Sequence, residues 1–224
     1  MSKRLKEAKE KIDPANKYVL EEAVTLVKET SKVKFDATVE VHVKLNIDPK
    51  KSDQQIRASL KLPHGTGQTK RIAAFVSADK VKEAKEAGAF VTGSEELIAE
   101  IQKTNKTDFD MVIATPDMMP KLAVIAKVLG QKGMMPNPKA GTITPDPAKV
   151  IKELNSGMVS FKNDTSGNIH IAVGKVSFED KILIDNVNAF VEDLKRSKPE
   201  GVKGSFITAV YLSSSMGPSI KLEI

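Results

Sequence analysis

Hydrophobic and polar residues alternate strictly over residues 35–47, and this is the clearest pattern in the chain. Apolar side chains occupy every second position from Phe35 to Ile47, with polar or charged side chains between them. A period of two predicts a strand with one buried and one solvated face, which is typical of an antiparallel sheet. A turn-rich stretch, 48–53, follows, and we expect the alternating segment 56–62 to pair back on 35–47 as a hairpin.

The same period returns after residue 157, whereas the centre of the chain differs. There, short continuous apolar runs alternate with helical spacing, which indicates a parallel α/β unit with strands buried on both faces. In this centre we predict strands at 72–76, 90–91 and 111–114, and helices at 79–87, 95–102, 121–129 and 147–154. In the flanks we predict further strands at 159–162, 169–173 and 206–214, and helices at 2–12, 19–29 and 178–195.

We interpret the chain as a two-domain protein of mixed α/β (α+β) class. Residues 1–67 and 156–224 would form a discontinuous antiparallel-sheet domain of split β-α-β type, and residues 68–155 would form an inserted parallel α/β domain. Two chain crossings between domains make a natural hinge. We predict this hinge at Pro63, Gly65 and Gly67 on the way into the insertion, and at Gly157 on the way out.

The stretch 129–141, LGQKGMMPNPKAG, is so rich in glycine and proline that we predict neither a helix nor a central strand there. The prolines fix φ, which leaves the loop few conformations to lose on ordering. No acidic residue lies between Asp117 and Asp146, while Lys132 and Lys139 lie within the loop. We therefore expect this stiff, cationic loop to face an anionic surface.

Composition narrows the classes of function. A net charge of +6 and a pI of about 9.3 favour anionic partners, while 4% aromatic residues and no Trp argue against a general stacking platform for single-stranded bases. The chain has no Cys, and His42, His64 and His170 lack metal-ligand spacing, so we predict no metal and no cofactor. The sequence shows neither a bilayer-spanning run nor a secretory signal, so we expect no membrane partner, and the absence of Cys fits a cytosolic protein.

Two glycine motifs approach phosphate-binding sequences without completing them. Gly130-Gln131-Lys132-Gly133 lacks the P-loop spacing, and Gly65-Thr66-Gly67 is followed by Lys70 where a dinucleotide fingerprint needs glycine. A flexible interdomain turn is the better explanation of the second motif, because a lone Gly-x-Gly is a weak signal. A nucleotide-dependent enzyme remains an alternative because parallel α/β units bind nucleotides at the carboxyl ends of their strands, although no nucleophile-base set is visible.

Two polar stretches carry hydrogen-bonding groups. On the polar side of the first strand lie Asp36, Thr38, Glu40, His42 and Lys44, and His170 lies on the polar side of a later strand. Ser213-Ser214-Ser215 runs into the turn Met216-Gly217-Pro218, where small hydroxyls and exposed backbone suit a sugar-phosphate chain. Ordinary solvation and a plain hairpin are the alternatives.

Together these stretches resemble the large-subunit ribosomal protein L-one family in its bacterial form, over essentially all 224 residues. The resemblance implies a two-domain fold with a Rossmann-like insertion, and a non-catalytic RNA-binding protein. It rests, in matching order and spacing, on Lys34 to Val41 (KFDATVEV), Leu62 to Gly67 (LPHGTG), Ala114 to Asp117 (ATPD), Leu129 to Gly133 (LGQKG), Met135 to Thr142 (MPNPKAGT) and Met216 to Pro218 (MGP).

The resemblance also implies a role in the large ribosomal subunit, in the cytoplasm. The partners would be large-subunit rRNA at a mobile stalk, tRNA at the exit site whose deacylated form it helps to move and release, and mRNA of its own operon, which it represses. Off the ribosome we expect a monomer; a repressor that never enters ribosomes is the alternative. The implied RNA contacts are Lys34, Phe35, Thr38, Glu40, Gly167, His170, Ser215, Met216, Gly217 and Pro218, while Lys132 and Lys139 would serve a second anionic surface such as tRNA.

Three positions depart from the family's usual pattern. Ser215 stands where Thr is common and keeps the hydroxyl. Thr165 stands where a Lys is frequent, and Ala209 stands where a Ser is common. The last two changes would remove a phosphate contact and a hydrogen bond, so we expect somewhat weaker RNA binding.

Overall fold

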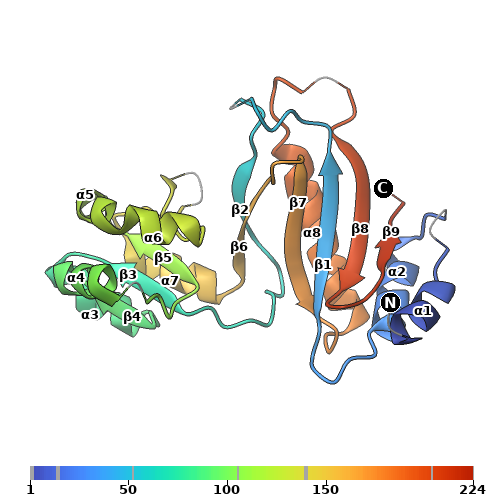
Figure 1. Cartoon of the computed structure of the whole chain (residues 1–224), viewed down its shortest axis with the longest axis horizontal. Coiled ribbons are helices and arrows are strands. Elements are labelled where there is room, and N and C mark those ends of the chain that lie inside the picture. The colour runs from blue at the N-terminus through green and yellow to red at the C-terminus, as the bar shows by residue number, and fades with distance from the viewer. Residues whose placement is uncertain are drawn as a thin grey trace. The chain divides into compact units, whose positions relative to one another are not determined.

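The structure is a computed structural model of the chain, and it describes residues 3–13, 16–51, 53–104, 106–138, 141–202 and 204–223. The chain divides into two compact units, one of residues 1–67 with 159–224 and one of residues 68–158 (Figure 1). An antiparallel sheet in the first unit and a parallel sheet in the second confirm the predicted mixed α/β class. None of the described helices is long and apolar enough to cross a membrane.

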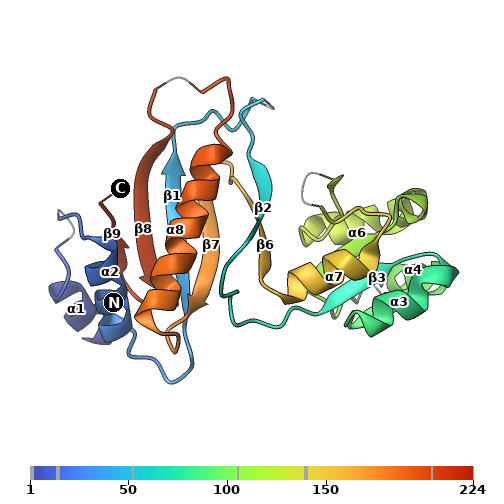
Figure 2. The same ribbon diagram turned by 180° about the vertical axis from the view of Figure 1, so that it is seen from behind.

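The first unit is built on a four-stranded antiparallel sheet in the order β7-β1-β8-β9. The predicted alternation holds along β1, where Val39, Val41 and Val43 are fully buried. They pack against apolar side chains of α2 and α8, and α8 lies along one face of the sheet (Figure 2). The elements are α1 (Lys3–Glu10), α2 (Leu20–Thr30), β1 (Thr38–Leu45), β7 (Asn168–Lys175), α8 (Asp180–Arg196), β8 (Ile207–Ser214) and β9 (Ser219–Lys221).

The predicted hairpin between 35–47 and 56–62 is wrong. β2 (Arg57–Lys61) pairs with β6 (Met158–Lys162) in a separate two-stranded sheet. Both edges of β1 are already occupied, by β7 on one side and β8 on the other. The alternation identified a half-buried strand correctly, but a period of two does not specify the partner strand.

The second unit has a three-stranded parallel sheet in the order β4-β3-β5. Every residue of β3 is buried, because its side chains alternate between two apolar clusters. Ala73 and Phe75 face one cluster, and Ile72 and Ala74 face the other, as the continuous apolar run predicted. The elements are β3 (Ile72–Phe75), α3 (Val81–Glu86), β4 (Val91–Gly93), α4 (Glu95–Thr104), β5 (Met111–Ala114), α5 (Met119–Leu122), α6 (Ala126–Gln131) and α7 (Pro147–Asn155).

The glycine- and proline-rich stretch begins as a helix, contrary to our prediction. α6 continues to Gln131, and its C-terminal cap includes Gly133, whose φ of 70° lies in the region that favours glycine. The N–H groups of Gly133 and Met134 donate to the carbonyls of Gly130 and Leu129, at 3.1 and 2.9 Å, which is a Schellman cap. A Cβ at Gly130 would meet no atom within 4 Å, so packing does not require glycine at this position of the last turn.

Candidate nucleic-acid interface

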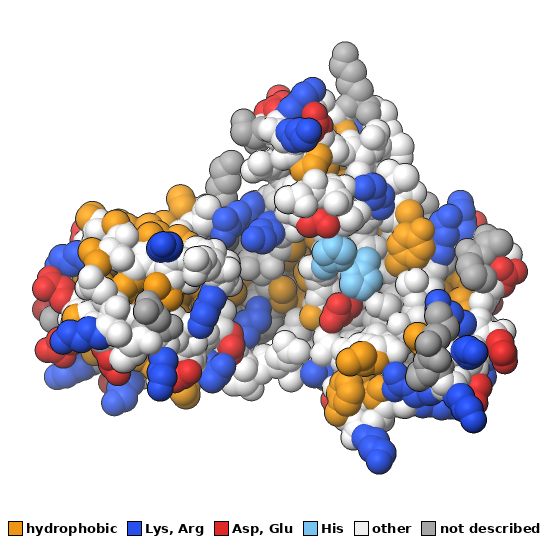
Figure 3. Space-filling model, viewed as in Figure 1, with side chains coloured by type: hydrophobic (Ala, Val, Ile, Leu, Met, Phe, Trp, Pro, Cys, Tyr) orange, Lys and Arg blue, Asp and Glu red, His pale blue; other side chains and the backbone are white. Residues whose placement is uncertain are grey.

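Strand register gathers polar side chains on the sheet face away from α8. His42 of β1 lies opposite His170 of β7 and Tyr211 of β8, and Glu40 lies opposite Ser213. Directly opposed residues of antiparallel strands share one side of the sheet, so distant parts of the sequence meet here. Figure 3 shows two adjacent histidine side chains on this surface, with acidic side chains on either side of them. We call this the polar sheet face.

A tight turn ends β8 beside the start of β1. The N–H of Gly217 donates to the carbonyl of Ser214 at 2.8 Å, and Met216 between them has a φ of 63°. Ser215 holds the turn against β1. Its N–H donates to the Thr38 carbonyl at 2.9 Å, and its Oγ accepts from the Thr38 N–H at 3.2 Å.

Two large apolar side chains are exposed on the segments that meet at this Thr38–Ser215 contact. Phe35 has an exposed fraction of 56%, and Met216 has one of 72%. Lys34 is exposed as well, whereas Pro218 is buried. Burial of apolar surface is favourable, so exposed Phe and Met beside a polar face indicate a surface that a partner covers.

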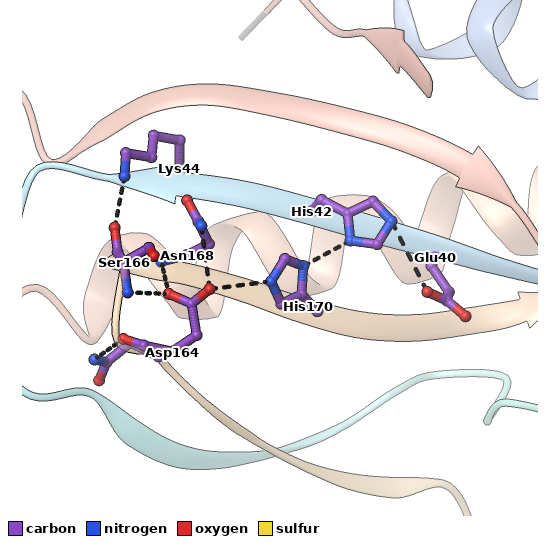
Figure 4. A network of polar contacts seen from close by, with 8 residues as sticks. Glu40, His42, Lys44, Asp164, Ser166, Asn168 and His170 are labelled. Atoms are coloured by element: carbon purple, nitrogen blue, oxygen red, sulfur yellow. Dashed lines mark hydrogen bonds and ion pairs between the residues drawn. The ribbon is translucent and has the colours of Figure 1, made fainter. Parts of the chain in front are cut away.

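The turn before β7 is organised by one carboxylate. Asp164 accepts from the N–H groups of Ser166 and Asn168 at 2.8 and 2.7 Å and from the Asn168 side-chain amide at 3.1 Å (Figure 4). These bonds, the Asn168 N–H first among them, lower the pKa of Asp164 to about 2. Gly167 is buried in this turn with a φ of 76°, and its carbonyl accepts from the Leu45 N–H, so its backbone shapes the turn.

A chain of polar contacts leads from this turn across the polar sheet face. Nε2 of His170 lies 3.5 Å from Oδ2 of Asp164, and Nδ1 of His170 lies 2.8 Å from Nδ1 of His42. His42 continues through Nε2 to Ser213 Oγ at 2.9 Å, with Glu40 Oε2 3.8 Å away. Burial lowers the pKa of His42, the neighbouring His170 lowers it further, and Glu40 raises it.

The predicted hinge residues on the way into the insertion belong to the first unit and contact its other elements. The side-chain amide of Asn186, a fully buried residue of α8, donates to the Gly65 carbonyl at 2.9 Å and accepts from the His64 N–H at 3.2 Å. A side chain at Gly67 would meet the Phe178 ring at 2.8 Å. Pro63 is exposed, and Gly157 has a φ of 103°. The hinge itself stays a prediction.

Of the two lysines predicted to serve a second surface, the structure describes only Lys132. Lys132 donates a hydrogen bond through Nζ to Thr107 Oγ1. Lys139 lies outside the described residues. The loop between them is partly anchored, because Pro136 is buried and Met134 and Met135 pack against the second unit's core.

Comparison with known proteins identifies the family. Residues 27–218 match the Ribosomal protein L1p/L10e family. The chain belongs to this family. It is 51% identical to the large ribosomal subunit protein uL1 of Mesoplasma florum, over 100% of this chain and 98% of that protein. It is 49% identical to the proteins of the same name from Mycoplasma capricolum and Thermosipho melanesiensis, over 99–100% of this chain and 96–98% of theirs.

Membership of the L1p/L10e family makes the chain a structural, rRNA-binding protein of the large ribosomal subunit, located with bacterial ribosomes in the cytoplasm. The family is not enzymatic, so the nucleotide-dependent enzyme alternative falls. The predicted resemblance is confirmed over the whole chain.

Two features of the polar sheet face were not predicted from the sequence: the role of Asp164 and the partner of His42. The turn composition Asp-Thr-Ser-Gly-Asn at residues 164–168 is the signal that could have indicated Asp164. His42 was noted on the strand without a partner, because its pairing with His170 depends on the register between β1 and β7. Ala209 lies opposite Lys44 on this face, so the departure there leaves a methyl group beside the Lys44 stem.

Proposed function

We propose that the polar sheet face, together with Phe35 and the 214–217 turn, is the surface by which this ribosomal protein holds a folded site on large-subunit rRNA. The observation that carries the proposal is the joint exposure of Phe35 and Met216 beside the Thr38–Ser215 contact. An aromatic ring and a methionine stem suit the faces of unstacked bases and riboses, which single-stranded and bulged RNA displays.

The turn suits close approach by RNA because its backbone is fixed in advance. The Gly217–Ser214 bond and the two Ser215–Thr38 bonds hold it, so little conformational entropy is lost when RNA binds. Glu40 accepts from ribose hydroxyls or base amino groups rather than contacting phosphate. The Lys34 and Lys44 ammonium groups supply the attraction to phosphate, although Lys44 also donates to the Ser166 carbonyl at 2.6 Å.

Two finer roles complete the proposal. One surface serves both rRNA and a similar structure in the operon's mRNA, so the protein represses translation of its own operon when it exceeds the available rRNA. On the ribosome it binds at the mobile stalk near the exit site and assists the movement and release of deacylated tRNA. The acid-free stretch 118–145 supports this second role by its positive charge. Off the ribosome the protein is a monomer.

The test is competition between RNAs at defined salt. Labelled rRNA stalk fragment is bound to the full chain, and an operon mRNA leader is added as competitor. We expect full displacement, and affinity that falls by roughly 0.7 to 0.9 log units per log unit of salt for each phosphate contacted. Failure of the leader to displace the rRNA would remove the repressor role and leave rRNA binding intact. Sedimentation analysis of the free protein tests the monomer.

A further inference from the structure

Two histidines in the middle of the polar sheet face share one hydrogen bond. Nδ1 of His42 and Nδ1 of His170 lie 2.8 Å apart (Figure 4). At this distance one proton must lie between the two nitrogens, because two N–H groups would repel each other and two lone pairs would form no bond. One ring therefore donates and the other accepts.

The outer nitrogens decide how many protons the pair can hold. A carboxylate only accepts, so Nε2 of His170, which faces Asp164 at 3.5 Å, carries a hydrogen. Nε2 of His42 faces Ser213 Oγ, which can donate or accept. When the pair is neutral, the Ser213 hydroxyl donates to Nε2 of His42. When the pair holds one added proton, Nε2 of His42 donates to Ser213 Oγ. The hydrogen bonds of the pair are complete in both states. A second added proton would oppose two N–H groups across 2.8 Å and break the shared bond.

The charges around the pair make its protonation matter for an anionic ligand. Glu40 and Asp164 flank the pair. Lys44 is the next residue of β1 on this face, and its Nζ donates to the Ser166 carbonyl. Tyr211 of β8 lies opposite His42. Register places Lys175 of β7 and Lys221 of β9 on this face as well, and Lys175 Nζ donates to Thr38 Oγ1 at 3.0 Å. The two carboxylates lie within 4 Å of the histidines, so one added proton offsets part of their charge, and a polyanion lying over this face favours the protonated pair.

The pair is accessible and has a proton to gain. The side chain of His170 is 52% exposed and that of His42 is 29% exposed. Burial and the adjacent His170 lower the pKa of His42, so the free protein holds this ring neutral at a pH where an ordinary histidine begins to protonate.

We propose that His42 and His170 form a proton-linked contact for the RNA sugar-phosphate chain, which takes up one proton when RNA covers the face. His42 is the positioning residue, because its shared hydrogen bond orients the more exposed His170. The inference rests on the proposed function, since it requires RNA at this face. Linkage then makes RNA affinity rise as pH falls, by at most about tenfold per pH unit for one proton.

The test is isothermal titration calorimetry of the full chain with the rRNA stalk fragment, in buffers of different ionisation enthalpy. Glutamine at position 42 keeps hydrogen-bonding groups but cannot gain a proton, so His42→Gln is the test variant. His64→Gln is the matched control, because His64 is exposed beside Asp185 at 3.3 Å and lies outside the polar sheet face. We expect proton uptake for the wild type and His64→Gln, none for His42→Gln, and a flatter affinity profile for His42→Gln over about pH 6 to 8.

The outcomes separate this inference from the proposed function. Binding by the wild type without proton uptake would overturn the inference and leave the RNA surface standing. No binding at all would overturn the proposed function. Nitrogen NMR of the imidazoles in the free protein gives an independent reading that needs no variant. We expect the spectra to show one hydrogen shared between the two Nδ1 atoms, and rings without a shared hydrogen would also overturn the inference.

Discussion

The guanidinium of Arg4 donates a hydrogen bond to the carbonyl oxygen of Met216, with 3.2 Å between Nη2 and the oxygen. Its Nη1 donates to the Lys32 carbonyl at 3.1 Å. One side chain of α1 thus reaches the 214–217 turn. Among the described residues, Met216 is the only non-glycine with positive φ, a conformation that costs free energy for a side chain. The Arg4 contact therefore stabilises the conformation that presents Met216.

Arg4→Ala should weaken RNA binding although it changes no residue of the proposed RNA surface. Loss of one partly exposed hydrogen bond to the turn should cost about 0.5–1 kcal/mol, a few-fold in affinity for the rRNA stalk fragment. Lys11→Ala is the control, because Lys11 pairs with Glu29 of α2 at 3.5 Å and does not contact the turn. Equal losses in both variants would show that the effect comes from the N-terminal segment as a whole.

Gly217→Ala should destabilise the turn through contacts of the new Cβ with Ser214. A Cβ at position 217 would lie 2.3 Å from Ser214 Oγ, a buried hydroxyl without a hydrogen-bond partner among the described residues. We expect a loss of about 1–3 kcal/mol in the free energy of unfolding, measured in urea. Ser214→Ala removes the obstructing atom and should be neutral or stabilising. The double variant should recover most of the loss; additive effects would contradict the steric explanation.

Asn186→Ala should be strongly destabilising. The Asn186 amide is fully buried and joins α8 to the Val173 carbonyl at 2.7 Å, to the Gly65 carbonyl and to the His64 N–H. Its removal leaves these backbone groups unsatisfied, so we expect a loss of about 2–4 kcal/mol in chemical denaturation. Asn188→Ala on the exposed side of α8 is the control and should change stability little. Similar midpoints for both variants would refute the role given to Asn186.

Acid should reveal the role of Asp164. Its pKa falls from 3.8 to about 2 on folding, because the Asn168 and Ser166 N–H groups bond its ionised form. A carboxyl with a lowered folded-state pKa stabilises the protein fully above its unfolded pKa, and this stabilisation is lost as pH falls from about 3.8 toward 2. Asp164→Asn should be less stable near neutral pH and should show a flatter stability profile in that window. Parallel profiles for variant and wild type would contradict this assignment.

The loop at residues 129–141 should act independently of the proposed rRNA surface. Replacing Lys132 and Lys139 with Ala should leave binding of the rRNA stalk fragment unchanged and should alter stalk behaviour and tRNA release on assembled ribosomes. Thr107→Val, which removes the Oγ1 that Lys132 contacts, controls for local disturbance of the loop. Loss of fragment binding in the lysine variant would return this loop to the primary RNA site.

Local patterns predicted the elements well. A strand buried on one face has alternating apolar and polar residues, and a strand buried on both faces has a continuous apolar run. The strict alternation around Val41 and the continuous run of β3 were both interpreted correctly. Pairings were harder, since they join residues far apart in the chain. The alternating segment 56–62 contains β2, as predicted, yet β2 pairs with β6, about a hundred residues away, and not with β1, which precedes it in the chain.

The same limit applies to the candidate site. The exposed Phe35 and Met216 could be named from the resemblance, but the contacts that position them depend on tertiary structure. The Arg4–Met216 bond and the His42–His170 bond span 212 and 128 residues, and neither has a local signal. The helical cap at Gly133 is a local feature, but the sequence did not predict it. The proline content of the whole stretch argued against a helix, although both prolines follow the cap.

The central claim is most directly tested by the affinity of Met216→Asp for the rRNA stalk fragment, measured beside Val124→Asp. Both positions expose an apolar side chain, at 72% and 60%, and Val124 lies in the second unit. Asp tolerates positive φ better than most residues, so the turn should survive the change. We predict that Met216→Asp loses specific binding while Val124→Asp binds like the wild type. Unchanged affinity of a correctly folded Met216→Asp variant would remove the 214–217 turn from the RNA surface.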